Sequence, residues 1–177
     1  GHLIPRKGVK ELLEAWAIFK ASCIDECSLV YVGSGPQEQE LRSFATSNNV
    51  KDFIMTGAVD YEQIAMFYKA ADCFIIPTLE DNWSLVVPEA MACGLPVATS
   101  VYNGCHPELV HSENGWTFDP LNKQSIVDVL DRIVSSKDKL LYMGRESLKI
   151  VSNETPERAA KSIMEAINFA IKRVRKK

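Results

Sequence analysis

Short runs rich in β-branched and aromatic residues alternate with longer amphipathic patterns, and this alternation constrains the fold more than any other feature. The runs are SLVYVG at 28–33, DFIMTG at 52–57, DCFIIP at 72–77, PVATS at 96–100 and GWTFD at 115–119. Helical patterns such as 8–21 and 36–48 separate them. Such repetition predicts an α/β fold, a Rossmann-like three-layer sandwich whose mostly parallel sheet carries helices on both faces. Because the first three runs are almost entirely apolar, we expect those strands to be covered on both sides.

The pattern changes near residue 122, where three helical segments follow one another at 122–136, 137–152 and 156–177. We therefore expect a single domain, 1–177, of which 122–177 is a mainly helical C-terminal flank. The closing KRVRKK is interpreted as a solvated helix end that complements the helix dipole, with a membrane anchor as the alternative.

The opening GHLIPRKGV looks like the exit of a strand rather than its start. We expect the first strand either to be missing or to survive only as the stub Leu3–Ile4, and the chain to be part of a larger protein. Gly1 and His2 could be remnants of cloning rather than native residues.

Composition excludes several classes of protein. A formal net charge of -3 argues against a nucleic-acid binder that relies on a general positive field, so any anion site must be local. The five cysteines are odd in number and are interpreted as reduced. Cys23 and Cys27 are followed by no second pair at zinc-ligand spacing, so we expect no metal site. With no leader peptide and no apolar run of about 20 residues, we expect a soluble, cytoplasmic chain.

The ends of the predicted strands carry the candidate ligand contacts, because ligands of open α/β sheets bind at the carboxyl ends of the strands. At 33–36 the sequence GSGP leads from a strand into a helix, and Gly33 permits close approach of the backbone to a ligand. A tight turn explains the same pattern equally well. Arg6 and Lys7 precede Gly8 and a helix, which suits a phosphate, although solvated surface charges are the alternative.

The stretch 78–97, TLEDNWSLVVPEAMACGLPV, is the most informative part of the sequence. Asp81 and Asn82 follow an apolar run in a loop, and Glu89 falls in the first turn of a helix that begins between the capping candidate Ser84 and Pro88. Two carboxylates at these depths, with free N–H groups between them, suit a polyhydroxyl ligand joined to phosphates. The alternative is that Asp81 is a turn residue and Glu89 complements the helix dipole.

Five blocks of the sequence, taken in order, resemble one known family. They are PRKGV, LVYVGSGPQEQEL, DFIMTGAV, AMFYKAADCFIIPTLEDNWSLVVPEAMACGLPVATS and ENGWTFDP. Together they resemble the C-terminal, nucleotide-sugar-binding domain of retaining glycosyltransferases with the GT-B fold, specifically family four, also called group 1. The resemblance implies one half of a GT-B fold, with the N-terminal Rossmann domain that binds the acceptor absent from this chain. It also implies a nucleoside diphosphate sugar as donor substrate, with no metal and no further cofactor.

The resemblance assigns roles to individual residues. Lys7, with Arg6 beside it, would neutralise the donor diphosphate, and Asp81 would contact the donor sugar, which makes these three the candidate catalytic residues. Glu89 would hold the ribose hydroxyls. The other donor-binding candidates are Gly33, Gly57, Val59, Asn82, Ser84, Leu85 and Val86. The sequence departs from the family pattern where Asp81 replaces a Glu, Ser84 replaces a Gly and His2 replaces an Arg.

The sequence thus predicts the donor-binding domain of an enzyme that transfers a hexosyl group, with retained configuration, to a glycan, lipid or polysaccharide precursor. We expect the isolated domain to be inactive or nearly so, and membrane association of the whole enzyme stays open. Two alternatives remain: a nucleotide-sugar epimerase of GT-B fold, and a non-catalytic nucleotide-binding α/β module.

Overall fold

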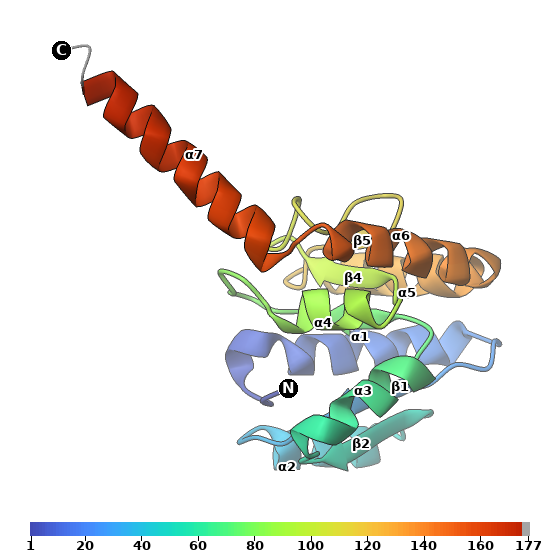
Figure 1. Cartoon of the computed structure of the whole chain (residues 1–177). Coiled ribbons are helices and arrows are strands. Elements are labelled where there is room, and N and C mark those ends of the chain that lie inside the picture. Colours follow the sequence, from blue (N-terminus) through green and yellow to red (C-terminus); the bar gives the residue numbers. More distant parts are fainter. Residues whose placement is uncertain (175–177) are drawn as a thin grey trace.

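The computed structural model describes residues 1–174, in which helices and parallel strands alternate (Figure 1). The strands are β1 (Leu29–Val32), β2 (Phe53–Gly57), β3 (Phe74–Ile76), β4 (Val97–Ser100) and β5 (Gly115–Phe118). The α-helices are α1 (Val9–Ser22), α2 (Glu38–Ser47), α3 (Tyr61–Ala70), α4 (Val86–Ala92), α5 (Lys123–Ser135), α6 (Leu140–Ser152) and α7 (Pro156–Val174). Two short 3₁₀ helices are η1 (Pro5–Lys7) and η2 (Lys137–Lys139). Each of the five predicted strands is therefore confirmed, as is the helical flank after residue 122.

The strands form two parallel sheets rather than one. β1 pairs with β2, and β3, β4 and β5 pair in that order. The register of the first pair shifts between Tyr31 and Val32, so that Val32 lies opposite Gly57. All three ladders are parallel, which confirms the predicted α/β class. Parallel pairing also places the carboxyl ends of paired strands at one edge, where a ligand site is expected.

The segment that precedes α1 joins the loops after β1 and β3. Leu3 is buried, its N–H donates to the Ser34 carbonyl at 2.9 Å, and the Gly1 amino group donates to the Val32 carbonyl. Gly1–Leu3 thus lies alongside the end of β1, although neither these residues nor Ile4, the end of the predicted stub, form a strand. On the other side, the N–H of Leu79 donates to the Arg6 carbonyl at 2.9 Å. The basic residues of η1 are therefore fixed between two strand ends.

The larger core cluster forms around α1, which presents the apolar face expected from its sequence. Leu12, Leu13, Trp16 and Phe19 are each at most 3% exposed and pack with β1, β5, α5 and part of α6. Full burial of a side chain of this size stabilises a fold by roughly 1.5–3 kcal/mol. This face therefore accounts for the position of α1 against both sheets.

A smaller cluster lies under the predicted site. It contains Ile76 of β3, Val87 and Met91 of α4, and Cys105, Leu109 and Val110 of the segment between β4 and β5. This cluster packs β3 and α4, the two elements that the candidate loop connects, against the segment between β4 and β5.

One expectation for the first strands is wrong. The apolar runs of β1 and β2 predict strands covered on both sides, yet Val30 is 43% exposed and Ile54 is 51% exposed. Side chains alternate between the two faces of a strand, so one face of this two-stranded sheet lacks a covering layer within residues 1–174.

Helix α7 projects away from the rest of the chain (Figure 1). Ile163, Met164, Ile167 and Ile171 recur at helical spacing on one face, and all four are exposed. The predicted solvated end KRVRKK falls only partly within the structure, because residues 175–177 lie outside the described range. No helix between residues 1 and 174 is both long and apolar enough to cross a membrane.

Candidate functional site

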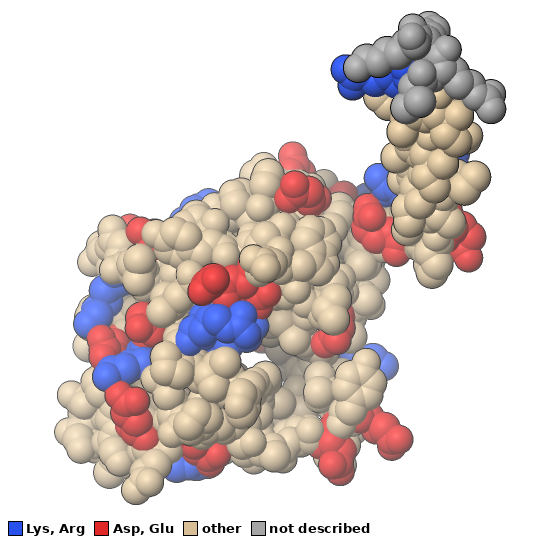
Figure 2. All heavy atoms as spheres, turned by 90° about the vertical axis from the view of Figure 1, so that its left-hand side faces the viewer, with Lys and Arg blue, Asp and Glu red and all other residues tan. Residues whose placement is uncertain are grey.

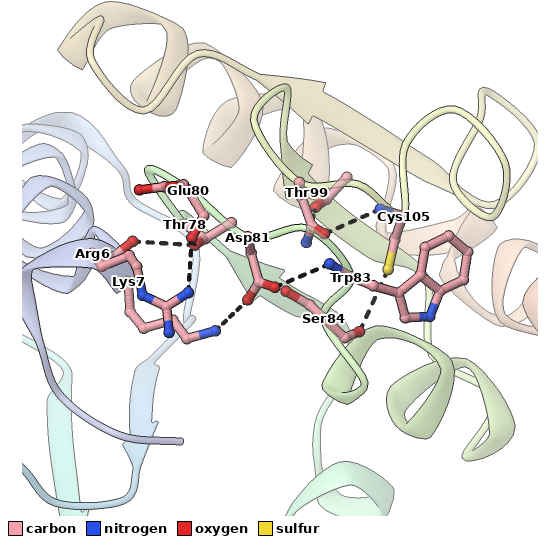
Figure 3. Close-up of polar contacts among 10 residues, drawn as sticks. Arg6, Lys7, Thr78, Glu80, Asp81, Trp83, Ser84, Thr99 and Cys105 are labelled. Carbon is pink, nitrogen blue, oxygen red and sulfur yellow. Dashed lines mark hydrogen bonds and ion pairs between the residues drawn. The ribbon is translucent and has the colours of Figure 1, made fainter.

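Lys7 and Asp81, predicted to share a site from positions 74 residues apart, form an ion pair. The Lys7 ammonium donates to Oδ2 of Asp81, and the two side chains are 25% and 12% exposed (Figure 3). Asp81 lies in the loop after β3, and Lys7 ends η1. The pair is therefore partly buried, where charges interact more strongly than they do on the open surface.

Two further contacts fasten η1 to this loop. The Arg6 carbonyl accepts from Oγ1 of Thr78 at 3.1 Å, and Nη1 of Arg6 donates to the Glu80 carbonyl at 3.3 Å (Figure 3). Thr78 is fully buried. Arg6 and Lys7 thus both lie at the loop that carries Asp81. Their predicted roles in binding a diphosphate stay predictions.

The pKa of Asp81 is set by opposing effects. Burial alone would raise this pKa, but the hydrogen bond and charge of Lys7, together with the N–H of Trp83 that donates to Oδ1 at 3.2 Å, lower it below its ordinary value. Asp81 is therefore ionised at neutral pH. Its negative charge and the positive charge of the Lys7 ammonium offset one another locally. Figure 2 shows Lys and Arg atoms directly beside Asp and Glu atoms in the middle of one face, next to a hollow.

The loop between Asp81 and α4 is held by the segment that follows β4. The N–H of Gly104 donates to the Asp81 carbonyl at 2.8 Å, and that of Asp81 donates to the Tyr102 carbonyl at 3.3 Å. Asn103 is buried, and its Nδ2 donates to Oγ1 of Thr99 at 3.0 Å. The segment 101–105 therefore acts as the support of the candidate loop, which the sequence did not predict.

Ser84 does not cap α4, contrary to the expectation from sequence. The helix begins at Val86, its N-cap position is Leu85, and no side-chain cap bond forms. Ser84 is 3% exposed, and its Oγ has no hydrogen-bond partner within residues 1–174. Asn82 and Leu85 are exposed, and Val86 is half-buried. The N–H groups of Leu85 and Val86 find no backbone acceptor in the described part of the chain, so they are free to meet a ligand.

Glu89 lies in the first turn of α4, as expected, and its side chain accepts a hydrogen bond from Tyr68 at 3.3 Å. Burial and the charge of Lys7 lower the pKa of the Gly1 amino group, and the charge of Glu89 partly offsets that shift. The charges of Lys7 and Glu89 thus both act on the Gly1 amino group.

The glycine-containing turns after β1 and β2 meet beside Gly1. The N–H of Gly33 donates to the Gly57 carbonyl at 3.0 Å, and both glycines have positive φ, +132° and +76°. A pocket of about 250 Å³ lies there, lined by Gly1, His2, Val32, Gly33, Ser34, Ala58, Val59 and Ile64. Sites for whole drug-sized ligands measure about 300–1,000 Å³, so this pocket matches one part of a larger ligand.

The structure thus brings Lys7, Arg6 and Asp81 together, and Gly33, Gly57 and Val59 together, whereas the side chain of Glu89 contacts Tyr68. Among the described residues, no group of three or more His, Cys, Asp or Glu side chains could hold a metal ion. Tyr68 and Asn103 were missed. The aromatic residue at helical spacing before an apolar strand was the only signal for Tyr68, and none pointed to Asn103.

The sequence profile described as "Glycosyl transferases group 1" matches residues 1–150. The chain belongs to this family. Among its relatives, an uncharacterized glycosyltransferase of Haemophilus influenzae is 30% identical over 148 residues, covering 83% of this chain and 41% of that protein. A GDP-mannose-dependent alpha-(1-6)-phosphatidylinositol monomannoside mannosyltransferase of Mycobacterium tuberculosis is 27% identical over 151 residues, covering 81% of this chain and 39% of that protein.

A solved structure has the same fold as this chain. Sucrose-phosphate synthase from Thermosynechococcus elongatus is 25% identical, with a TM-score of 0.78, covering 98% of this chain and 44% of that one. The architecture is that of one half of a GT-B glycosyltransferase, as expected. The chain spans about two fifths of the length of the curated relatives described here.

Proposed function

We propose that this chain is the donor-binding part of a glycosyltransferase that moves a sugar from a nucleoside diphosphate sugar to an acceptor with retained configuration. The observation that carries the proposal is the Lys7–Asp81 pair in a chain of the glycosyl transferases group 1 family. The Gly1 amino group, whose residue lines the glycine-containing pocket, is affected by the charges of both Lys7 and Glu89. The names of two relatives support the same class, since one transfers mannose and depends on GDP-mannose. The acceptor then binds to a part of the whole protein outside this chain.

Each group of the site has a task in this reaction. The pocket that contains Gly33 and Val59 receives the base, Glu89 accepts hydrogen bonds from the ribose hydroxyls, and Asp81 accepts from the donor sugar. Negative charge develops on the leaving diphosphate when the bond between the anomeric carbon and the phosphate oxygen breaks. Lys7 and Arg6 stabilise that charge, because they are held in place before the reaction begins.

Two other functions fit the fold less well. A nucleotide-sugar epimerase of GT-B fold is not favoured by membership of a glycosyl transferase family. A non-catalytic nucleotide-binding module is distinguished by mutation: it predicts that Asp81→Ala and Glu89→Ala leave the role of the whole protein intact, whereas the transferase loses acceptor-dependent release of nucleoside diphosphate in both variants.

The test is calorimetric titration of the 177-residue chain with UDP, GDP and ADP and with their sugar conjugates. We expect saturable binding of one nucleotide, weakened by Lys7→Ala and by Glu89→Ala. Lys10→Ala is the matched control, because Lys10 lies one turn further along, is exposed and pairs with Glu40 instead. A chain that binds none of these nucleotides contradicts the proposal.

We also expect the 177-residue chain to bind donor without turning it over, because the acceptor site lies elsewhere in the proposal. Acceptor-dependent release of nucleoside diphosphate by this chain alone would contradict that expectation.

A further inference from the structure

Tyr68 makes a polar contact with the candidate ribose-binding carboxylate. It lies in the last turns of α3, and its hydroxyl donates to Oε2 of Glu89 at 3.3 Å. The same hydroxyl lies 3.5 Å from the Val86 carbonyl. A phenol has one proton to donate, and an ionised carboxylate is the stronger acceptor. The proton of Tyr68 is therefore directed to Glu89.

The ring of Tyr68 is held in place from the other side. It packs edge-on against Phe74 of β3, with ring centroids 5.6 Å apart and an interplanar angle of 76°. α3 has no buried residue, so this half-buried ring is a principal anchor of the helix to the smaller core cluster. A rigid ring gives its hydroxyl a fixed position, which a flexible donor would lack.

A role in packing would explain why the Tyr68 ring is half-buried against Phe74, but not why its hydroxyl contacts a carboxylate. Buried tyrosines usually find some acceptor, and a backbone carbonyl would serve. Here the acceptor is a carboxylate that has no basic partner within ion-pair distance in residues 1–174. Burial first, and then the charge of Glu89, raise the pKa of Tyr68 well above its ordinary value. The phenol consequently stays protonated, and it remains a donor across the physiological pH range.

We infer that Tyr68 is a positioning residue, which holds one oxygen of Glu89 so that the other is presented to the ribose hydroxyls of the donor. This inference rests on the proposed function, because it takes Glu89 as the ribose contact. A carboxylate offers about four acceptor positions on two oxygens, so the bond from Tyr68 leaves ample capacity for two hydroxyls. Fixing the rotamer beforehand removes an ordering cost that binding would otherwise bear.

The experiment compares a ribonucleotide with an analogue that lacks the hydroxyls in question. The 177-residue chain is titrated with UDP or GDP, whichever binds more tightly, and with its 2′,3′-dideoxy form. Tyr68→Phe deletes only the hydroxyl and keeps the ring against Phe74. We expect it to weaken binding of the ribonucleotide about 10- to 100-fold, as for loss of a hydrogen bond to a charged group, and binding of the dideoxy form less than about twofold.

Controls separate positioning from packing. Tyr61→Phe changes the same residue type on the same helix, where Tyr61 is 79% exposed, and should alter neither affinity. Glu89→Gln should reduce the preference for ribose at least as much as Tyr68→Phe does. Equal weakening of both ligands by Tyr68→Phe would mean a structural role and would overturn the inference.

The outcomes also separate this inference from the proposed function. If Glu89→Gln reduces the ribose preference and Tyr68→Phe does not, the inference fails while the donor site stands. If the wild-type chain binds ribonucleotide and dideoxy form alike, or binds neither, the role of Glu89 fails and both proposals fall.

Discussion

Replacement of Asp81 by Asn tests whether the Lys7–Asp81 pair is part of the folded structure rather than a chance surface contact. The substitution keeps the volume of the side chain and removes its charge, which leaves the Lys7 ammonium without its partner. The two side chains are 25% and 12% exposed, so the pair lies between an open surface pair and a buried one. Exposed pairs contribute roughly 0.2–1 kcal/mol, and breaking a fully buried pair costs about 3–5 kcal/mol.

For a partly buried pair we therefore expect the free energy of unfolding to fall by about 1–2 kcal/mol in Asp81→Asn. In a chain of this length, such a loss lowers the thermal midpoint by roughly 2–8 °C. Urea unfolding of wild type and variant at pH 7 measures the difference directly, provided that both transitions have the same slope. The control is Glu40→Gln, which breaks the exposed Lys10–Glu40 pair and should cause no measurable change.

The pH dependence of the free energy of unfolding is a second, independent test of the contribution of Asp81 to stability. The folded pKa of Asp81 lies below its unfolded value of about 3.9, so its contribution to stability is fully present above that value. It is lost as the pH falls through the folded pKa. The difference between wild type and Asp81→Asn should therefore be constant from about pH 6 to pH 8 and shrink below about pH 4. Equal stability of the two proteins at pH 7 would refute the argument that this pair is formed and shielded.

Three more predictions concern turnover, backbone and core. Lys7→Ala in the whole enzyme should lower turnover by a factor of about 100 or more, as for loss of about 3–4 kcal/mol of transition-state stabilisation, and wild-type rates would contradict it. Gly8→Ala should destabilise the chain by roughly 3 kcal/mol or more on unfolding, because φ is +65° and the new Cβ would lie 1.9 Å from a backbone oxygen. Gly57→Ala, with φ +76° and open space around it, should cost only about 1–2 kcal/mol by the same measurement. Leu13→Ala should cost about 2–5 kcal/mol, whereas the half-exposed Ile18→Ala should change the unfolding midpoint little.

Local signals in the sequence account for most of the fold. The five strand positions follow from short runs of β-branched and aromatic residues, and the buried face of α1 follows from the spacing of Leu12, Leu13, Trp16 and Phe19. Both features depend on side chains that are close in sequence, so a single sequence suffices to predict them. The order of motifs likewise predicted the family.

Features that depend on distant partners were not predictable. The division into two sheets is decided by which backbone edges meet, and the exposure of Val30 and Ile54 depends on what covers a sheet face rather than on their own apolar character. The position of Ser84 is a similar case: its residue type favours a cap, but the N-cap position of α4 is Leu85 and the helix begins at Val86 without a side-chain cap bond.

The charges of the candidate site bear on how a chain of net charge -3 could bind a diphosphate at all. Lys7 and Arg6 contribute two positive charges, and Asp81 and Glu89 contribute two negative ones, so the four formal charges cancel. A doubly negative diphosphate therefore meets no net attraction from these groups as a set, and its binding depends on where each one lies. In the proposed function Lys7 would be shared between Asp81 and the ligand, whereas Arg6 is exposed and, within residues 1–174, its side chain donates to the Glu80 carbonyl. In the proposed function, Arg6 would meet the diphosphate from its position beside the Glu80 carbonyl, and partial release of Lys7 from Asp81 would leave that carboxylate able to accept from the sugar. Under the proposed function, the same ion pair would supply both the cation for the leaving group and the acceptor for the donor sugar.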